Sequence, residues 1–166
     1  MIVATKLDGV FIHHPDKHQD ARGFFAELIC DKSITQHCVS FNYLRGTLRG
    51  LHYQKSPYEQ TKIVRCTAGS IYDVVVDLRV SSPTYLQYVQ IELSAENRYS
   101  IHVPKGFAHG FQTIVDSSEV FYQFDAPYNA EASSGVRWDD TIFSISWPLP
   151  VSIICDRDRT YSDYKS

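Results

Sequence analysis

The sequence lacks the features that mark several specialised classes of protein. No apolar run reaches the ~20 residues that a membrane-spanning helix needs, and the N-terminus lacks the basic and apolar regions of a signal peptide. The net charge is −3, so there is no overall basic field that would attract nucleic acid. We therefore expect a soluble protein of the cytoplasm that binds neither membranes nor nucleic acid.

Cysteine is scarce, and no two cysteines form a C-x-x-C pair. Their wide spacing is unlike that of a structural zinc site, so we expect reduced thiols. The four cysteines are Cys30, Cys38, Cys66 and Cys155. The chain also lacks repeats and low-complexity segments, and its 166 residues are enough for one hydrophobic core. We expect a single domain over residues 1–166.

The pattern of apolar residues predicts a β-protein. Tyrosine and phenylalanine, which favour strands, number 11 and 9. From residue 60 onward, short strand-like segments are separated by turn residues about every ten positions, which is typical of sandwiches and barrels. Residues 107–114 and 119–125 read as a strand pair joined by a turn. One short helix is expected over residues 31–38, with Asp31 as its N-cap. The aromatic segment from Ser134 onward is expected to fold back onto the domain.

Residues 45–65 concentrate the polar side chains that need an explanation. Because side chains alternate along a strand, we expect Arg49 and His52 on opposite faces, and Gln60 and Lys62 on one face of the next strand. Such a group suits a cavity for an anionic ligand, with a histidine placed for proton transfer. The alternative is a polar strand edge in water.

Two groups of histidines invite a metal interpretation, and we favour neither. His13, His14 and His18 surround Pro15, which is typical of a solvated turn. The segment at 104–109 fits the P-x-G-x-x-H pattern of the second cupin motif. Cupins usually carry an H-x-H pair in their first motif, whereas here only His52 is present. Two histidines without a third ligand make a poor metal site, so we expect no metal.

Longer fragments resemble a more specific family. They follow one another in family order: residues 49–54, 62–65, 73–79, 82–84, 93–97, 106–111, 138–140 and 147–148. Together they resemble the dTDP-4-dehydrorhamnose 3,5-epimerase family over nearly the whole chain. The resemblance implies an all-β fold, a cupin-type double-stranded β-helix (jelly-roll) barrel with short peripheral helices. It also implies a homodimer that acts on a nucleotide-linked, most simply dTDP-linked, 4-keto-6-deoxy sugar without a metal or organic cofactor.

The resemblance assigns four catalytic residues. His52 matches the family's base, and Asp158 matches the carboxylate that orients it, although Asp156 lies only two residues away. Tyr122 matches the acid on the opposite sugar face, and Lys62 is placed to stabilise an enolate oxygen. These are the groups that inversion beside a ketone needs, because one proton is removed and another is returned to the opposite face.

The same matching implies a set of substrate-binding residues. They are Arg22, Phe25, Glu27, Arg49, Gln60, His109, Tyr128 and Arg157. Arg22 and Arg49 would clamp the diphosphate, since guanidinium groups match phosphate oxygens, and Arg22 would reach into the neighbouring subunit. Phe25, Glu27 and Tyr128 would contact the nucleotide base.

Departures from the family pattern leave alternatives open. The stretch 36–42 differs from the family's nucleotide-contacting pair, and Ser133 or Ser134 stands where the family has a glutamate. The alternatives are an epimerase acting at C3 only and a non-catalytic cupin that binds sugar nucleotides. Two more distant ones are a metal-dependent cupin dioxygenase and a sugar 3,4-ketoisomerase.

Overall fold

The computed structural model describes residues 1–29 and 31–165 and is built almost wholly from antiparallel β-structure. The strands are β1 (Ile2–Ala4), β2 (Phe11–His13), β3 (Lys17–Asp20), β4 (Gly23–Ala26), β5 (Gln36–Asn42), β6 (Leu48–Gln54), β7 (Lys62–Ala68), β8 (Ser70–Asp77), β9 (Tyr88–Ser94), β10 (Ser100–Val103), β11 (Phe107–Thr113), β12 (Ser118–Phe124) and β13 (Ser133–Gly135). The helix described is α1 (Asp156–Arg159), a single turn. The all-β prediction is confirmed.

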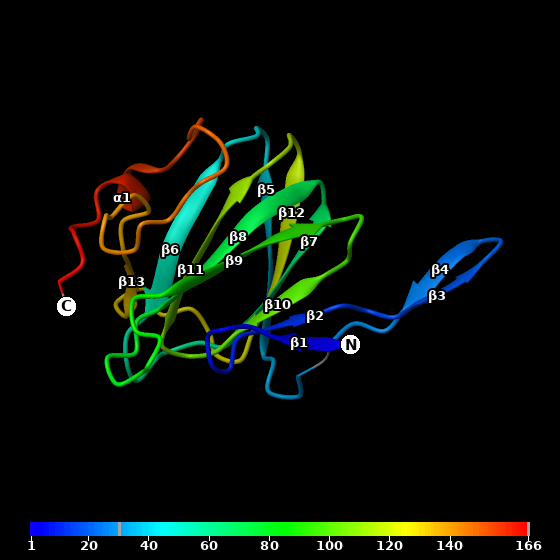
Figure 1. The fold of residues 1–166 in the computed structure, drawn as a ribbon, viewed down its shortest axis with the longest axis horizontal. Helices are drawn as coiled ribbons and strands as arrows, with labels where there is room; N and C mark the ends of the chain where they lie inside the picture. Colours follow the sequence, from blue (N-terminus) through cyan, green and yellow to red (C-terminus); the bar gives the residue numbers. More distant parts are fainter. Residues whose placement is uncertain (30, 166) are drawn as a thin grey trace.

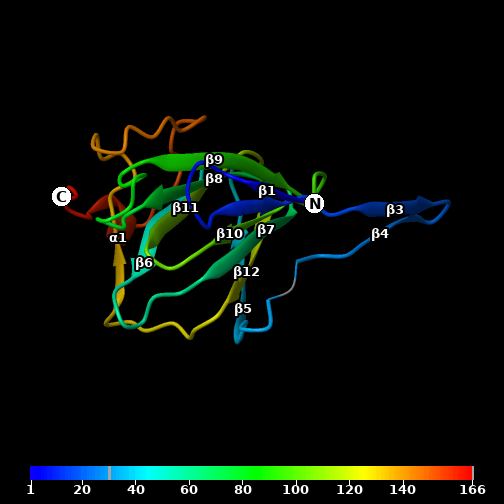
Figure 2. The ribbon, with the colours of Figure 1, turned by 60° about the horizontal axis from the view of Figure 1, so that its bottom comes forward.

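Two sheets face each other and enclose the core (Figures 1 and 2). The six-stranded sheet has the order β1-β2-β10-β7-β12-β5, and the five-stranded sheet has the order β13-β6-β11-β8-β9. Strands β3 and β4 form a separate two-stranded hairpin that projects away from the barrel (Figure 1). None of the helical structure in residues 1–29 and 31–165 is long and apolar enough to cross a membrane.

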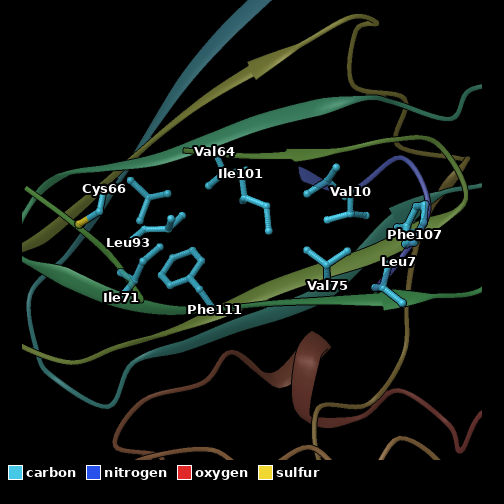
Figure 3. Close-up of a cluster of buried hydrophobic side chains, with 12 residues drawn as sticks. Leu7, Val10, Val64, Cys66, Ile71, Val75, Leu93, Ile101, Phe107 and Phe111 are labelled. Atoms are coloured by element: carbon cyan, nitrogen blue, oxygen red, sulfur yellow. The ribbon is translucent and has the colours of Figure 1, made fainter. Parts of the chain in front are cut away.

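The continuous apolar run of β8 is explained by burial on both of its faces. Ile71 and Val75 point into the barrel, where they join the core cluster shown in Figure 3. Val74 and Val76 point outward, into a second apolar layer that contains Phe143 from the C-terminal segment. The C-terminal segment therefore folds back over the five-stranded sheet, as the sequence predicted.

The predicted helix over residues 31–38 is wrong. Asp31 forms a local turn instead, because its Oδ1 accepts a hydrogen bond from the Ser33 N–H at 2.8 Å. Residues from Gln36 onward belong to β5, which pairs along its whole length with β12. The backbone thus finds its hydrogen bonds in a neighbouring strand, and tertiary pairing overrides a local capping signal. The expected short peripheral helices reduce to α1 within the described residues.

The predicted strands at 107–114 and 119–125 exist, but their predicted pairing is wrong. β11 lies in the five-stranded sheet between β6 and β8, whereas β12 lies in the six-stranded sheet between β7 and β5. The turn between them, with Ser117 at a φ of 54°, carries the chain from one sheet to the other. A turn signal marks where a strand ends and leaves its partner undetermined.

The N-terminal histidines are not all in a turn. His13 lies in β2 and His18 in β3, and the ring of His14 stacks on Tyr99 at a centroid distance of 3.8 Å. Within the described residues, no three histidine, cysteine or acidic side chains are grouped so as to hold a metal ion. The other cysteines are free thiols, and Cys30 lies outside the described residues.

A close contact between β6 and β11 depends on two glycines. Gly50 has a φ of 122°, and a Cβ added there would lie 2.6 Å from the Cα of Gly110. A Cβ on Gly110 would in turn lie 2.6 Å from the carbonyl oxygen of Arg49. The two backbones can therefore approach each other only because neither residue carries a side chain.

We expect Gly50→Ala to destabilise the fold by about 2–5 kcal/mol, because backbone strain and steric overlap add at this position. Gly23→Ala is the matched control: Gly23 has a φ of 132°, but no heavy atom lies within 4 Å of its added Cβ. Urea denaturation of both variants measures the difference. Equal losses in the two variants would show that the contact between β6 and β11 is unimportant.

Candidate active site

A cavity of about 270 Å³ opens between the two sheets. Eight of the predicted site residues line it: Arg49, His52, Gln60, Lys62, His109, Tyr122, Tyr128 and Arg157. They come from β6, β7, β11, β12, α1 and the adjoining loops. The group is therefore the wall of a cavity and not a polar strand edge in water.

The prediction that Arg49 and His52 lie on opposite faces of their strand is wrong, because both line the cavity. The pairing of β6 with β11 changes register between them: His52 pairs with His109, whereas Arg49 pairs with Phe111. This irregularity, at Gly50, reverses the alternation of side chains. Leu51 remains on the outer face, fully buried against the C-terminal layer.

His52 is held by the carboxylate of Asp158 from α1. Its Nε2 lies 2.6 Å from Oδ1, and Oδ2 accepts a hydrogen bond from the Gly50 N–H at 2.9 Å. Burial opposes ionisation of Asp158, but the hydrogen bonds from His52 and Gly50 prevail and lower its pKa. An ionised carboxylate only accepts hydrogen bonds, so the His52 Nε2 donates in this contact, and Nδ1 is the ring nitrogen that Asp158 does not engage.

The competing carboxylate, Asp156, is exposed at the first position of α1. It has no contact with His52, whereas the side chain of Asp158 is only 2% exposed. The geometry therefore separates two acidic residues that the sequence places side by side. Asp158 is the carboxylate that orients the histidine ring.

Lys62 enters the cavity from β7, in the sheet opposite His52. Its Nζ donates to the His52 carbonyl oxygen at 3.3 Å, and the residue is 8% exposed. Burial lowers its pKa to about 8, and the negative charge of Asp73 partly opposes this effect. The ammonium group is therefore a cation in a poorly solvated place, where it interacts strongly with a nearby negative charge.

Tyr122 also enters from the six-stranded sheet, on β12. Its ring stacks on Phe124 at a centroid distance of 5.7 Å and meets the edge of His109 at 6.2 Å. Burial and the negative charge of Asp73 raise its pKa, so the phenol keeps its proton at neutral pH. His52 and Tyr122 thus stand on opposite sheets with the cavity between them.

Two arginines border the same cavity, and each is oriented by neutral groups. The Arg49 Nε donates to Asn42 Oδ1 at 2.7 Å. The Arg157 guanidinium donates to Ser133 Oγ at 2.6 Å and to the Tyr161 hydroxyl at 2.8 Å. Neither guanidinium has a carboxylate partner among the described residues. Both keep their positive charge available for an anion.

Comparison with known proteins gives consistent matches over the whole chain. The family model described as dTDP-4-dehydrorhamnose 3,5-epimerase matches residues 4–166. The chain belongs to the dTDP-4-dehydrorhamnose 3,5-epimerase family.

Individual members of this family are similar in both sequence and structure. The dTDP-4-dehydrorhamnose 3,5-epimerase of Sinorhizobium fredii is 42% identical over 156 residues, which is 88% of this chain and 80% of the relative. The enzyme of that name from Bacillus anthracis, solved with TDP and PPi bound, is 40% identical, with a TM-score of 0.95 and 99% coverage of both chains. The dTDP-6-deoxy-D-glucose-3,5-epimerase of Legionella pneumophila, in complex with dTDP-4-keto-L-rhamnose, is 35% identical, with a TM-score of 0.88 and coverage of 95% and 89%.

Three predicted residues of this epimerase-family chain lie away from its own cavity. Arg22, Phe25 and Glu27 lie on the β3–β4 hairpin or just after it, where all three are exposed. Arg22 forms an ion pair with Asp20 at 2.6 Å, and Phe25 is 74% exposed. The hairpin points away from the barrel (Figure 1), so these residues do not contribute to the cavity of the chain that carries them.

Two residues at the site were missed in the sequence. Asn42 orients Arg49, and Tyr161 meets the His52 ring edge-on at a centroid distance of 6.4 Å. Asn42 belongs to the stretch in which the chain departs from the family pattern, which is a signal that something local differs. No sequence pattern marked Tyr161, because its contact with His52 depends on how the C-terminal segment folds back.

We expect Asp158→Asn to change the protonation of His52. Without a carboxylate to accept its hydrogen bond, the Nε2–H form should lose its preference, and the two neutral tautomers should become mixed. Long-range ¹H–¹⁵N NMR of the imidazole nitrogens measures this directly. Asp156→Asn is the matched control and should leave the His52 signals unchanged. An unchanged spectrum in Asp158→Asn would remove Asp158 from its assigned role.

Proposed function

We propose that this chain is an isomerase that inverts C3 and C5 of a nucleotide-linked 4-keto-6-deoxyhexose. The reaction would convert dTDP-4-dehydro-6-deoxyglucose to dTDP-4-dehydro-L-rhamnose. One observation carries the proposal: the His52–Asp158 pair and Tyr122 stand on opposite sheets of one cavity, with a buried lysine beside them. The names and bound ligands of the relatives support the substrate class.

The geometry fits the chemistry of epimerisation beside a ketone. Nδ1 of His52 removes the proton from the carbon next to the carbonyl group, and Asp158 stabilises the imidazolium that forms. The electrons move onto the carbonyl oxygen, where the Lys62 ammonium stabilises the enolate. The Tyr122 hydroxyl then gives a proton to the opposite face, and solvent restores the protonation state of both residues. This sequence of steps needs only side chains, so we propose no metal or organic cofactor.

The diphosphate would be bound by the arginines at the cavity. Arg49 and Arg157 have no carboxylate partners among the described residues, so their guanidinium groups are free to pair with phosphate oxygens. Tyr128 is 58% exposed on the same cavity and offers its ring to the nucleotide base. Gln60 and His109 complete the wall around the sugar.

We propose further that two copies of the chain form a homodimer, which acts in the cytoplasm on this soluble substrate. The outer face of β5 exposes Val39 and Phe41, and the hairpin exposes Phe24 and Phe25. Apolar patches of this kind mark interaction surfaces. In a dimer, the hairpin of one copy would bring Arg22, Phe25 and Glu27 to the cavity of its neighbour.

The decisive experiment is NMR of the purified protein with dTDP-4-keto-6-deoxyglucose in deuterated water. We expect deuterium at both C3 and C5, with conversion to the L-sugar, because each inversion replaces a carbon-bound proton with one from solvent. Deuterium at C3 alone would make the protein a 3-epimerase with the same catalytic groups. Binding without exchange at either carbon would favour a non-catalytic sugar-nucleotide-binding protein.

Two variants test the catalytic assignments within that experiment. His52→Ala should abolish exchange at both carbons, and exchange at the wild-type rate would exclude His52 as the base. Tyr122→Phe should keep some exchange and lose inversion, because proton removal survives while the donor on the opposite face is gone. The contribution of each group to the rate should be about 10²–10⁴-fold. Unimpaired epimerisation by Tyr122→Phe would exclude the tyrosine as the acid.

Mixing two inactive variants tests the shared site. In the proposed composite cavity, Arg22 comes from one chain and His52 from the other. A dimer of one Arg22→Ala chain and one His52→Ala chain therefore has one complete site. Equal mixing after subunit exchange should restore about a quarter of the wild-type activity. The matched control is His52→Ala mixed with Tyr122→Phe: both residues come from one chain, so no site is repaired. Activity equal to the sum of the separate Arg22→Ala and His52→Ala proteins would exclude an exchanged arginine.

A further inference from the structure

A second histidine–carboxylate pair lies inside the barrel and has no part in the scheme above. His109 on β11 and Asp73 on β8 belong to neighbouring strands, and the histidine Nε2 lies 2.8 Å from Asp73 Oδ2. Their side chains are 4% and 0% exposed. A carboxylate buried so completely is costly unless its charge is compensated, so its presence needs a reason.

The hydrogen bonds of Asp73 are incomplete. Its Oδ1 has no hydrogen-bond partner among the described residues, although buried carboxylate oxygens nearly always have one. Lys62 has unused hydrogen-bond donors. Of the three N–H groups of its ammonium group, one donates, to the His52 carbonyl oxygen. A buried anion with a spare acceptor and a buried cation with spare donors therefore occupy the same barrel.

The two charges act on each other. The negative charge of Asp73 raises the pKa of Lys62 against the burial that lowers it to about 8. The other charged or titratable groups that line the cavity with Lys62 are Arg49, His52, Tyr53, His109, Tyr122, Tyr128 and Arg157. None of them supplies a carboxylate, and Asp158 is already bonded to His52 and Gly50. Asp73 is thus the carboxylate in the described barrel that is left to balance the lysine.

We propose that Asp73 is a positioning residue that keeps Lys62 protonated, so that its ammonium group can stabilise the developing enolate oxygen. Asp73 does not touch the substrate, because it lies behind the cavity wall, and it acts through Lys62. The inference rests on the proposed function, in which the ammonium group stabilises the enolate. The carboxylate offsets the cost of a buried cation in the resting enzyme, and the new negative charge on the substrate oxygen shares that cation during the reaction.

Asp73→Asn tests the proposal, because it removes the charge and keeps the shape of the side chain. The negative charge of Asp73 raises the pKa of Lys62, so its removal should move the basic limb of the pH–kcat profile to lower pH, by about one unit. The loss of kcat relative to wild type should grow with pH and reach about tenfold or more above pH 8, where Lys62 is losing its proton.

Asp140→Asn is the matched control. Asp140 is also a buried carboxylate, but it lies outside the cavity and accepts hydrogen bonds from the backbone N–H groups of Ile142 and Tyr164. This variant should lose some thermal stability and keep the wild-type pH profile. A purely structural Asp73 would behave in the same way, and that result for Asp73→Asn would overturn the proposal.

A measurement without substrate separates this proposal from the proposed function. The ¹³Cε signal of Lys62, assigned by its loss in Lys62→Met, reports the titration of the ammonium group. The Lys62 pKa should fall in Asp73→Asn by at least about one unit, and an unchanged value would overturn the proposal. The expected fall together with no deuterium exchange in the wild-type protein would overturn the proposed function, and with it the catalytic purpose of the pair.

If Asp73→Asn does not fold, His109→Gln gives a second test. It removes the hydrogen-bonding partner of Asp73 and leaves the carboxylate in place. The Lys62 pKa should then stay at the wild-type value or rise. A fall of about one unit would show that the histidine maintains the charge of Lys62, and would overturn the role of Asp73.

Discussion

The carboxylate of Asp158 connects the site to the fold. It accepts a hydrogen bond from the Gly50 N–H on β6 and pairs with His52 two residues further along the same strand. Asp158 belongs to α1, which lies in the C-terminal segment that covers the outer face of the five-stranded sheet. The contact that orients His52 therefore also attaches the C-terminal segment to β6.

The electrostatics of the cavity differ from those of the whole chain. The protein carries a net charge of −3, yet Arg49, Arg157 and Lys62 converge on one cavity. Lys62 is buried, so its field is weakly screened and acts strongly on an enolate, whereas Arg49 and Arg157 are exposed to an incoming anion. Burial also keeps the Tyr122 phenol protonated. In the proposed mechanism, these cations and this proton donor lie where negative charge would develop.

Local sequence patterns located most strands and did not determine their partners. The strands β11 and β12 were recognisable from their apolar patterns, but the expectation that they pair failed because the turn between them crosses from one sheet to the other. The helix expected at 31–38 failed for a related reason: the backbone from Gln36 onward pairs with β12. Strand pairing is a long-range interaction, so a short window of sequence cannot report it.

The sequence by itself determined the family and the residue types at the site, because runs such as residues 49–54 contain the residue types of the family in the family's order. Only the tertiary structure decided which of those residues lie together at one cavity. A change of register at Gly50 brings Arg49 to the same side as His52, and the projecting hairpin carries Arg22 away from its own cavity. The contacts of Asn42 with Arg49 and of Asp73 with His109 also appear only when distant strands lie side by side. The sequence fixes which chemical group each residue carries. The direction of that group and the residues it contacts depend on bends of the backbone and on pairing between distant strands.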